Sequence, residues 1–415
     1  MKPKQISRHF LQLLSGAVVA QFINLASYPL LARIFSPTQF GVFASFLAAA
    51  AIPSAIACGR FDIVIPTAPN YGQFAVLRLC HIISATISVL SGFALYLYWT
   101  SINASHPIVY SFTMAITVFT SGYISATSMI LMRHEQFAVT STSIIARTGI
   151  TVILQICLSA IWLNPLVLVF GSCCGAVIQA ILLRNHLARH ILMRTIRIKQ
   201  MRLMFARYKQ QVLIDAPSTL LAAATLNIMP FFIQLLYGHK LVGFYAVGQR
   251  FAIMPMQLFN DSFAQIFFQK AAAAKESKGS FWPEFKLTII SAGTIALAAV
   301  ICIWTFGNII ITILLGSSWE PAAEMLAILV PMLALRSVVM SIATTVFVLK
   351  RVTWLLYHNC ASASVMVIAF SFAYNVNVGI YTYLKISAWL LSIEYLLFGV
   401  ILARATLREH VGIRA

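Results

Sequence analysis

The stretch RNHLARHILMRTIRIKQMRLMFARYK, residues Arg184–Lys209, decides the architecture of this chain. It holds eight of the chain's 29 Lys and Arg residues and no Asp or Glu. The sequence on each side is mostly apolar. Basic residues at this density do not enter hydrocarbon, and beside membrane spans they mark the cytoplasmic side. We therefore predict an N-terminal lobe over residues 1–183, a basic cytoplasmic linker over 184–210 and a C-terminal lobe over 211–415.

The composition requires lipid as the solvent. The chain is 60% hydrophobic and 9% charged, with a mean hydropathy of +0.88, whereas about a quarter of the residues in soluble proteins are charged. The net charge of +19 raises the question of whether this protein binds nucleic acid. Its positive residues lie in short segments between apolar runs, which fits membrane topology and contact with anionic lipid headgroups. We predict membrane lipids as partners and no nucleic acid.

About twelve apolar runs reach the length of roughly 20 residues that a span needs. Because lipid-exposed backbone must satisfy its own hydrogen bonds, an all-α integral membrane protein follows. The segment Gly307–Leu315 either extends the ninth span or forms a short outer helix. The predicted spans are Phe10–Ile34, Phe40–Cys58, Val76–Trp99, Ile108–Met132, Phe137–Trp162, Pro165–Leu183, Gln211–Leu236, Leu241–Phe268, Leu287–Phe306, Ala322–Leu349, Val352–Tyr374 and Ile380–Ala403.

The basic residues that flank the spans give the orientation. If both termini are cytoplasmic, nearly all of them fall in inner segments, and the outer loops receive only Arg33 and Lys240. This asymmetry predicts a multi-pass protein with both termini in the cytoplasm.

The two halves resemble each other. The shift that aligns Gly41 with Gly243 sets the sequence FGVFA against VGFYA and also aligns Pro53 with Pro255. Each half would enter its second span through an aromatic-glycine turn and bend that span at a proline. We predict a parallel six-plus-six repeat, an arrangement typical of transporters with a site between two lobes.

Four positive residues fall inside predicted spans, namely Arg147, Arg250, Arg336 and Lys385. A charge at the centre of a span costs about 2.5 to 3.5 kcal/mol, so it is usually sheltered and functional. Lys385 lies near a span end, from which a lysine can reach the interface. The excess of positive charge predicts a cationic cavity for an anionic substrate. The alternative is that ion pairs hold the helices together.

The acids near or inside spans are few: Asp62, Asp215, Asp261 and Glu394. Asp261 follows Arg250 by three helical turns, so both share one face of the predicted eighth span. Asp215 and Glu394 are candidates to bind a proton or sodium ion, or to pair with an arginine. Both alternatives stay open.

Signatures of enzymes and metal sites are missing from the sequence. There is no G-x-x-x-x-G-K-[ST] phosphate loop, and His134-Glu135 lacks the second histidine of a zinc helix. The seven cysteines lie mostly in apolar runs without a C-x-x-C pair, which argues against disulfides and metal binding. We predict a transporter without a cofactor, with a proton or sodium gradient as one candidate energy source.

Three motifs resemble those of bacterial flippases for O-antigen and polysaccharide repeat units, within the multidrug/oligosaccharidyl-lipid/polysaccharide exporter superfamily. Residues Leu31–Phe43 read LARIFSPTQFGVF and are similar to the end of the first span in that family. Residues Arg60–Pro66 read RFDIVIP and resemble its R-Y-E-x-A-I motif, with Asp62 in place of glutamate. Residues Val242–Ala246, followed by Arg250 and Pro255, resemble its pattern for the eighth span.

The resemblance implies the MATE-like exporter fold, with two six-helix lobes that alternate access across a bacterial inner membrane. It implies an undecaprenyl-pyrophosphate-linked oligosaccharide as cargo for O-antigen or capsule synthesis. A polysaccharide polymerase and a chain-length regulator are the partners that it suggests. It carries Arg60, Asp62 and Arg250 over as functional positions.

Two other functions remain as alternatives. A cation-coupled multidrug exporter of the same fold would need an acid-rich cavity for cationic drugs. A polysaccharide polymerase would carry a large outer loop, which this sequence lacks.

Overall fold

A computed structural model describes residues 3–101, 106–190, 198–351 and 353–414, with some side chains inside the helices left out. In these ranges the regular structure is entirely helical, which confirms the predicted fold class. The chain forms two compact units, residues 1–227 and 228–415. The division falls inside a helix, α7 (Ile198–Tyr237). Part of the predicted linker, residues 191–197, lies outside the described residues.

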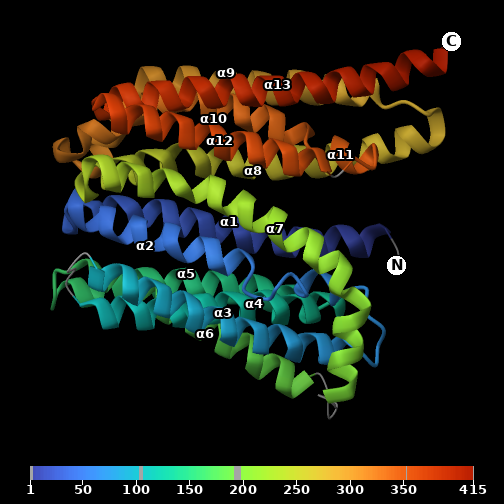
Figure 1. Cartoon of the computed structure of the whole chain (residues 1–415), viewed down its shortest axis with the longest axis horizontal. Coiled ribbons are helices and arrows are strands. Elements are labelled where there is room, and N and C mark those ends of the chain that lie inside the picture. The colour runs from blue at the N-terminus through green and yellow to red at the C-terminus, as the bar shows by residue number, and fades with distance from the viewer. Residues whose placement is uncertain (1–2, 102–105, 191–197, 352, 415) are drawn as a thin grey trace. The chain divides into compact units, whose positions relative to one another are not determined.

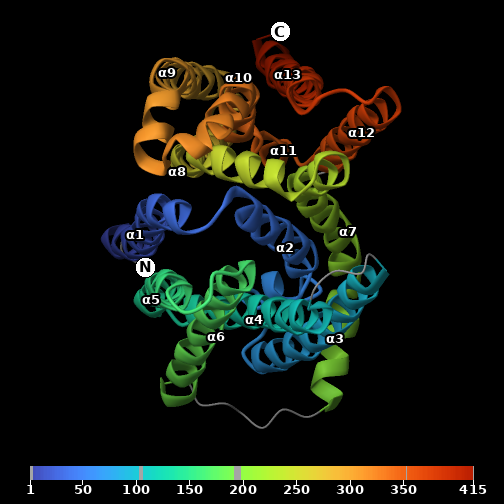
Figure 2. The ribbon, with the colours of Figure 1, turned by 90° about the vertical axis from the view of Figure 1, so that its left-hand side faces the viewer.

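Unit 1 contains the first six long helices (Figure 1). They are α1 (Pro3–Ile34), α2 (Pro37–Ala55), α3 (Gln73–Ser101), α4 (Pro107–Arg133), α5 (Phe137–Ser159) and α6 (Pro165–His190). Viewed along the bundle, α4 lies between α3 and α6 (Figure 2). Helix α5 packs against α1 and α6. A short 3-10 helix, η1 (Asp62–Val64), interrupts the segment between α2 and α3.

Unit 2 is built around α10 (Glu320–Ile342), which packs against α8 (His239–Lys278), α9 (Trp282–Leu315) and α13 (Ile380–Arg414). The short α11 (Thr345–Val348) contacts α8, and α12 (Thr353–Val376) packs against α13. Helix α9 extends to Leu315, so Gly307–Leu315 continues the ninth span. The predicted tenth span is divided between α10 and α11.

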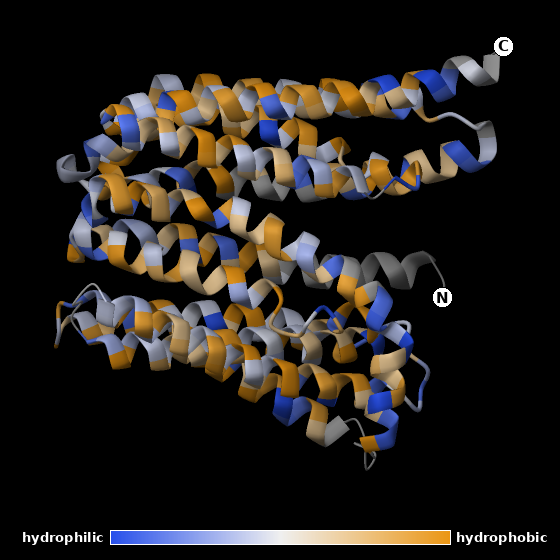
Figure 3. Cartoon of the chain, in the orientation of Figure 1, coloured by the Kyte–Doolittle hydropathy of each residue, from blue (hydrophilic) through white to orange (hydrophobic). Residues whose placement is uncertain are grey.

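The helices have the length and composition of membrane spans. Among the described residues, 11 helical segments are long and apolar enough to cross a membrane. The remaining predicted span, Leu241–Phe268, lies in α8, which is not among these 11 segments and has several side chains outside the described residues, so it stays a prediction. On α9, large apolar side chains such as Leu297 and Trp304 are exposed, as expected where lipid is the neighbour. Hydrophilic residues gather toward the C-terminal end of α13 in unit 2 and the N-terminal part of α7 in unit 1 (Figure 3).

The sequence explains where many helices begin. Ser36 caps α2, because its hydroxyl accepts from the Gln39 amide while the Gln39 side chain accepts from the Ser36 amide. Proline stands at the first position of α2, α4 and α6, where its missing N–H costs nothing. The shift that aligns Gly41 with Gly243 also aligns the starts of α2 and α8, at Pro37 and His239. This agreement is consistent with the predicted repeat, which stays a prediction.

Candidate functional site

The segment between α2 and α3, residues 56–72, folds into unit 1; we call it the α2–α3 segment. Gly59 and Arg60 adopt left-handed backbone conformations, with φ of 56° and 63°. That conformation costs a residue with a side chain about 1 kcal/mol or more. From the end of α4, Arg133 Nη1 donates to the carbonyl oxygens of Ile65 at 2.7 Å and Ala68 at 2.5 Å. The surrounding structure therefore fixes this segment, although its sequence has no regular period.

Arg60 and Asp215, two of the predicted site residues, come together in unit 1. Arg60 Nε, on the α2–α3 segment, lies 2.5 Å from Asp215 Oδ2, on α7. Thr219 Oγ1 lies 3.5 Å from the same carboxylate oxygen. The side chains of the ion pair are 25% and 37% exposed, so water screens it in part. In this structure Asp215 is the partner of an arginine, one of the two alternatives left open above.

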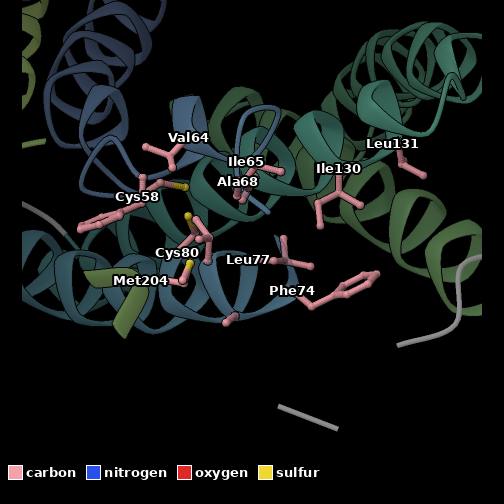
Figure 4. Packing of buried hydrophobic residues seen from close by; sticks show 14 of the residues in the cluster. Cys58, Val64, Ile65, Ala68, Phe74, Leu77, Cys80, Ile130, Leu131 and Met204 are labelled. Atoms are coloured by element: carbon pink, nitrogen blue, oxygen red, sulfur yellow. The ribbon is translucent and has the colours of Figure 1, made fainter. Parts of the chain in front are cut away.

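Asp62, two residues after Arg60, lies on η1 beside an apolar cluster. Its side chain is buried, and Ser125 Oγ on α4 donates to Asp62 Oδ2 at 2.6 Å. The other carboxylate oxygen has no hydrogen-bond partner among the described residues. The apolar cluster around η1 includes Cys58 and Cys80 (Figure 4). A buried carboxylate with one hydroxyl donor is costly, so Asp62 is a second acid of functional interest in unit 1.

Arg147 lies within the span formed by α5 and is half-buried. Its Nη1 donates to Gln179 Oε1 on α6 at 3.3 Å, and Gln179 Nε2 donates to Ser143 Oγ at 3.3 Å. The two helices approach closely here, since a Cβ added to Gly175 would lie 2.8 Å from the Arg147 carbonyl oxygen. Among the described side chains, no carboxylate lies within ion-pair distance of Arg147.

Arg336 occupies a similar position in unit 2, within the span that contains α10. It lies near Tyr395 and Tyr245. Among the described side chains, it also has no carboxylate at ion-pair distance. It borders a small pocket of about 20 Å³, room for about one water molecule. The pocket is lined by Ile253, Met256, Asn260, Leu333, Arg336 and Ser337.

Glu394 on α13 is the most buried paired acid among the described residues. Its Oε1 lies 2.6 Å from His358 Nδ1 on α12, and Ser362 Oγ donates to its Oε2 at 2.8 Å. The His358 and Glu394 side chains are only 4% and 9% exposed. The His358 ring also stacks on Phe398 at 4.3 Å. Each carboxylate oxygen of Glu394 therefore has a polar partner inside the span.

The remaining predicted residues lie on α2, α8 and α13. Arg250 on α8 is half-buried, and Lys385 on α13 is exposed, which fits the expectation that its position near a span end allows it to reach the interface. The side chains of Asp261 and Pro255 lie outside the described residues, so the helix face shared by Arg250 and Asp261 stays a prediction. Gly41 and Gly243 are both buried near helix starts, and Pro53 lies inside α2.

The sequence interpretation missed the neutral partners of the charged residues: Ser125, Gln179, His358, Ser362 and Tyr395. One signal was available, because His358 and Ser362 stand four residues apart in a span and so share one helix face. The other partners depend on which helices are neighbours, and an apolar pattern does not contain that information.

Comparison with known proteins agrees with this fold. A family described as polysaccharide biosynthesis proteins matches residues 30–324. No curated protein sequence matches the chain. The lipid II flippase MurJ, in an inward closed conformation, is similar in structure with a TM-score of 0.71 and 12% identity, over 98% of this chain and 91% of that chain.

Two other solved structures belong to multidrug and related transporters. An inward-facing multidrug resistance MATE transporter of the MOP superfamily gives a TM-score of 0.66 at 15% identity, over 97% of this chain and 98% of that chain. A MOP superfamily transporter from Pyrococcus furiosus, whose binding pocket of reversed polarity suggests a different function, gives a TM-score of 0.62 at 17% identity. The match covers 99% of this chain and 96% of that chain. The shared fold confirms the predicted MATE-like architecture of a multi-pass membrane protein.

Proposed function

We propose that this chain, which belongs to the polysaccharide biosynthesis protein family, translocates lipid-linked oligosaccharide repeat units between the leaflets of a bacterial inner membrane. The cargo would be an undecaprenyl-pyrophosphate-linked unit for O-antigen, capsule or exopolysaccharide. Transport would proceed by alternating access, from the cytoplasmic to the periplasmic leaflet. A polymerase would then receive the exported units.

The observation that carries this proposal is the environment of Arg147 and Arg336. Both lie within candidate spans, and among the described side chains neither has a carboxylate at ion-pair distance. A guanidinium in such a place keeps its charge available for an anion, and its planar fork suits phosphate oxygens. A diphosphate that joins a lipid to a sugar is an anion of this kind. A cationic drug would instead favour carboxylates, so the drug-exporter alternative receives less support.

The buried pair of His358 and Glu394 is the candidate for energy coupling. A carboxylate shared between a histidine and a serine can take up and release a proton without leaving a bare charge in the span. Glu394 is therefore proposed as the site where a proton or sodium gradient acts on unit 2. Asp62 in unit 1 is the second candidate, because one of its oxygens has no partner among the described residues.

Deletion of the gene in its own host tests the cargo. Loss of surface polysaccharide, with undecaprenyl-linked units accumulating on the cytoplasmic face, would support the proposal. Normal polysaccharide together with greater sensitivity to cationic drugs would identify a drug exporter instead.

Complementation with variants tests the site. Arg336→Ala should restore export about tenfold to a hundredfold less well than the wild type, because it removes a charged hydrogen bond worth about 1.5 to 3 kcal/mol. Arg336→Lys should keep part of the activity. Arg404→Ala is the matched control, since Arg404 is exposed on α13. Full export by Arg336→Ala at an equal amount of protein would exclude Arg336 from the site.

A further inference from the structure

The N-terminal part of α7, residues 198–210, lies outside the hydrocarbon-spanning part of that helix; we call it the α7 foot. The predicted span begins only at Gln211, and residues 198–210 hold four Lys and Arg residues. Figures 1 and 2 both show the foot running across the end of the unit 1 helices, whereas the bundle helices run lengthwise. Pro217, at the start of the span, favours a change in helix direction. The foot therefore has the orientation of a helix that lies along a membrane surface.

The inner side of the foot is fixed to unit 1. Met204 is fully buried in the apolar cluster around η1 (Figure 4). Gly72 provides room for it, because a Cβ there would lie 2.5 Å from the Met204 sulfur. The ring of Phe205 stacks on Phe61 of the α2–α3 segment with a centroid distance of 5.6 Å. The foot thus has a set position at the end of the unit.

The outer side of the foot combines positive charge with exposed apolar side chains. Lys199, Arg202, Arg207 and Lys209 are exposed, and the foot contains no acid. Between them stand Ile198 and Leu203, which are 71% and 57% exposed. Water alone is a poor environment for such a surface. Basic residues interleaved with large apolar ones are typical of helices at the boundary between headgroups and acyl chains.

We propose that the α7 foot docks on the anionic phospholipid headgroups of the leaflet at this end of unit 1. The positive side chains would reach phosphate groups, while Ile198 and Leu203 enter the outer part of the acyl region. Nucleic acid or an acidic protein would satisfy the charges but leave the apolar side chains without a partner. The proposal does not depend on the identity of the transported cargo.

Hydrogen exchange of the full chain in nanodiscs tests this proposal. The two preparations are phosphatidylcholine alone and phosphatidylcholine with about a third of phosphatidylglycerol. Amide exchange in residues 198–210 should be slowed about tenfold in the anionic nanodiscs, because each basic residue near a charged surface adds favourable energy. Exchange in the bundle helices should be the same in both preparations.

Two variants with the same change in net charge locate the effect. The test variant neutralises the foot, with Lys199→Gln, Arg202→Gln, Arg207→Gln and Lys209→Gln. The control neutralises four exposed cations of unit 2, with Lys270→Gln, Lys286→Gln, Arg404→Gln and Arg408→Gln. The test variant should lose the protection by phosphatidylglycerol, and the control variant should keep it. A third variant, Leu203→Ser, should keep part of it.

Three results would overturn the proposal. The first is equal exchange of the wild-type foot in both kinds of nanodisc. The second is an equal loss of protection in the control variant, which would indicate a general effect of net charge. The third is protection by inorganic pyrophosphate in neutral nanodiscs to the same degree, because the foot would then bind a diphosphate rather than a lipid surface.

Discussion

The two units neutralise a membrane acid in different ways. In unit 1, Asp215 meets Arg60 at the end of a span, with both side chains a quarter or more exposed. In unit 2, Glu394 meets His358 inside a span, with both side chains less than a tenth exposed. An arginine keeps its charge at any physiological pH, whereas a histidine can gain or lose a proton. The first pair is thus suited to hold a position, and the second is the pair that we propose for energy coupling.

The two units differ in their acid pairs but are alike in the arginines within their spans. Each contains an arginine within a span, Arg147 in unit 1 and Arg336 in unit 2, that has no carboxylate at ion-pair distance among the described side chains. If the Arg60–Asp215 pair holds its segment in position and the His358–Glu394 pair couples transport to an ion gradient, the two arginines remain to bind the cargo. Three experiments test this division of roles.

The largest effect is expected for the buried pair of unit 2. Glu394→Ala should lower the free energy of unfolding by about 3 kcal/mol or more, because it leaves buried His358 and Ser362 without their partner. Glu394→Gln should lower the free energy of unfolding less, since an amide still forms hydrogen bonds with His358 and Ser362. The measurement is denaturant unfolding of the purified protein in detergent micelles.

A matched pair in the same unit provides the control. Lys275 Nζ lies 2.7 Å from Glu409 Oε1, but these side chains are 33% and 37% exposed. Glu409→Ala should therefore cost less than about 1 kcal/mol. Equal losses for Glu394→Ala and Glu409→Ala would show that burial does not distinguish the two acids.

An intermediate effect is expected for the arginine of unit 1. Arg147→Ala should reduce export by about tenfold, as the loss of a charged hydrogen bond to an anion predicts. Gln179→Ala should reduce it less, because Gln179 orients the guanidinium and carries no charge itself. The measurement is surface polysaccharide in a deletion strain at equal membrane levels of each protein. If the two variants lose export equally, the role of Arg147 is packing between α5 and α6.

Much of the fold could be predicted from the sequence, because the thickness of the bilayer limits the length of apolar runs. Helices α5 and α13 begin at Phe137 and Ile380, the residues predicted from such runs. The bilayer sets no limit on helix length beyond the hydrocarbon. For that reason, the extension of α7 back to Ile198 and of α8 on to Lys278 was not predicted.

The candidate site was predicted only in part. A charged residue inside an apolar run is visible in the sequence, and Arg147, Arg336 and Glu394 were found in this way. Their partners were not, since Gln179 is paired with Arg147 only because α5 and α6 are neighbours. The resemblance pointed to Arg60 and Asp62 in the α2–α3 segment, but the fold of that segment was not predicted, because it depends on contacts from α4 and α7 rather than on a local repeat.

The smallest effect is expected for the ion pair of unit 1, and it tests whether that pair is an anchor. Arg60→Gln and Asp215→Asn, alone and together, form a double-mutant cycle for the free energy of unfolding. The coupling energy should be about 0.5 to 1 kcal/mol, because the pair is partly exposed. Added salt should weaken the coupling.

An anchor needs two opposite charges, but either residue can carry the positive one. The exchanged pair Arg60→Asp with Asp215→Arg should therefore recover part of the export lost by either single exchange. If the exchanged pair instead stays inactive while its stability returns, the Arg60 charge itself serves transport. The contrast between a fixed pair in unit 1 and a titratable pair in unit 2 would then no longer hold.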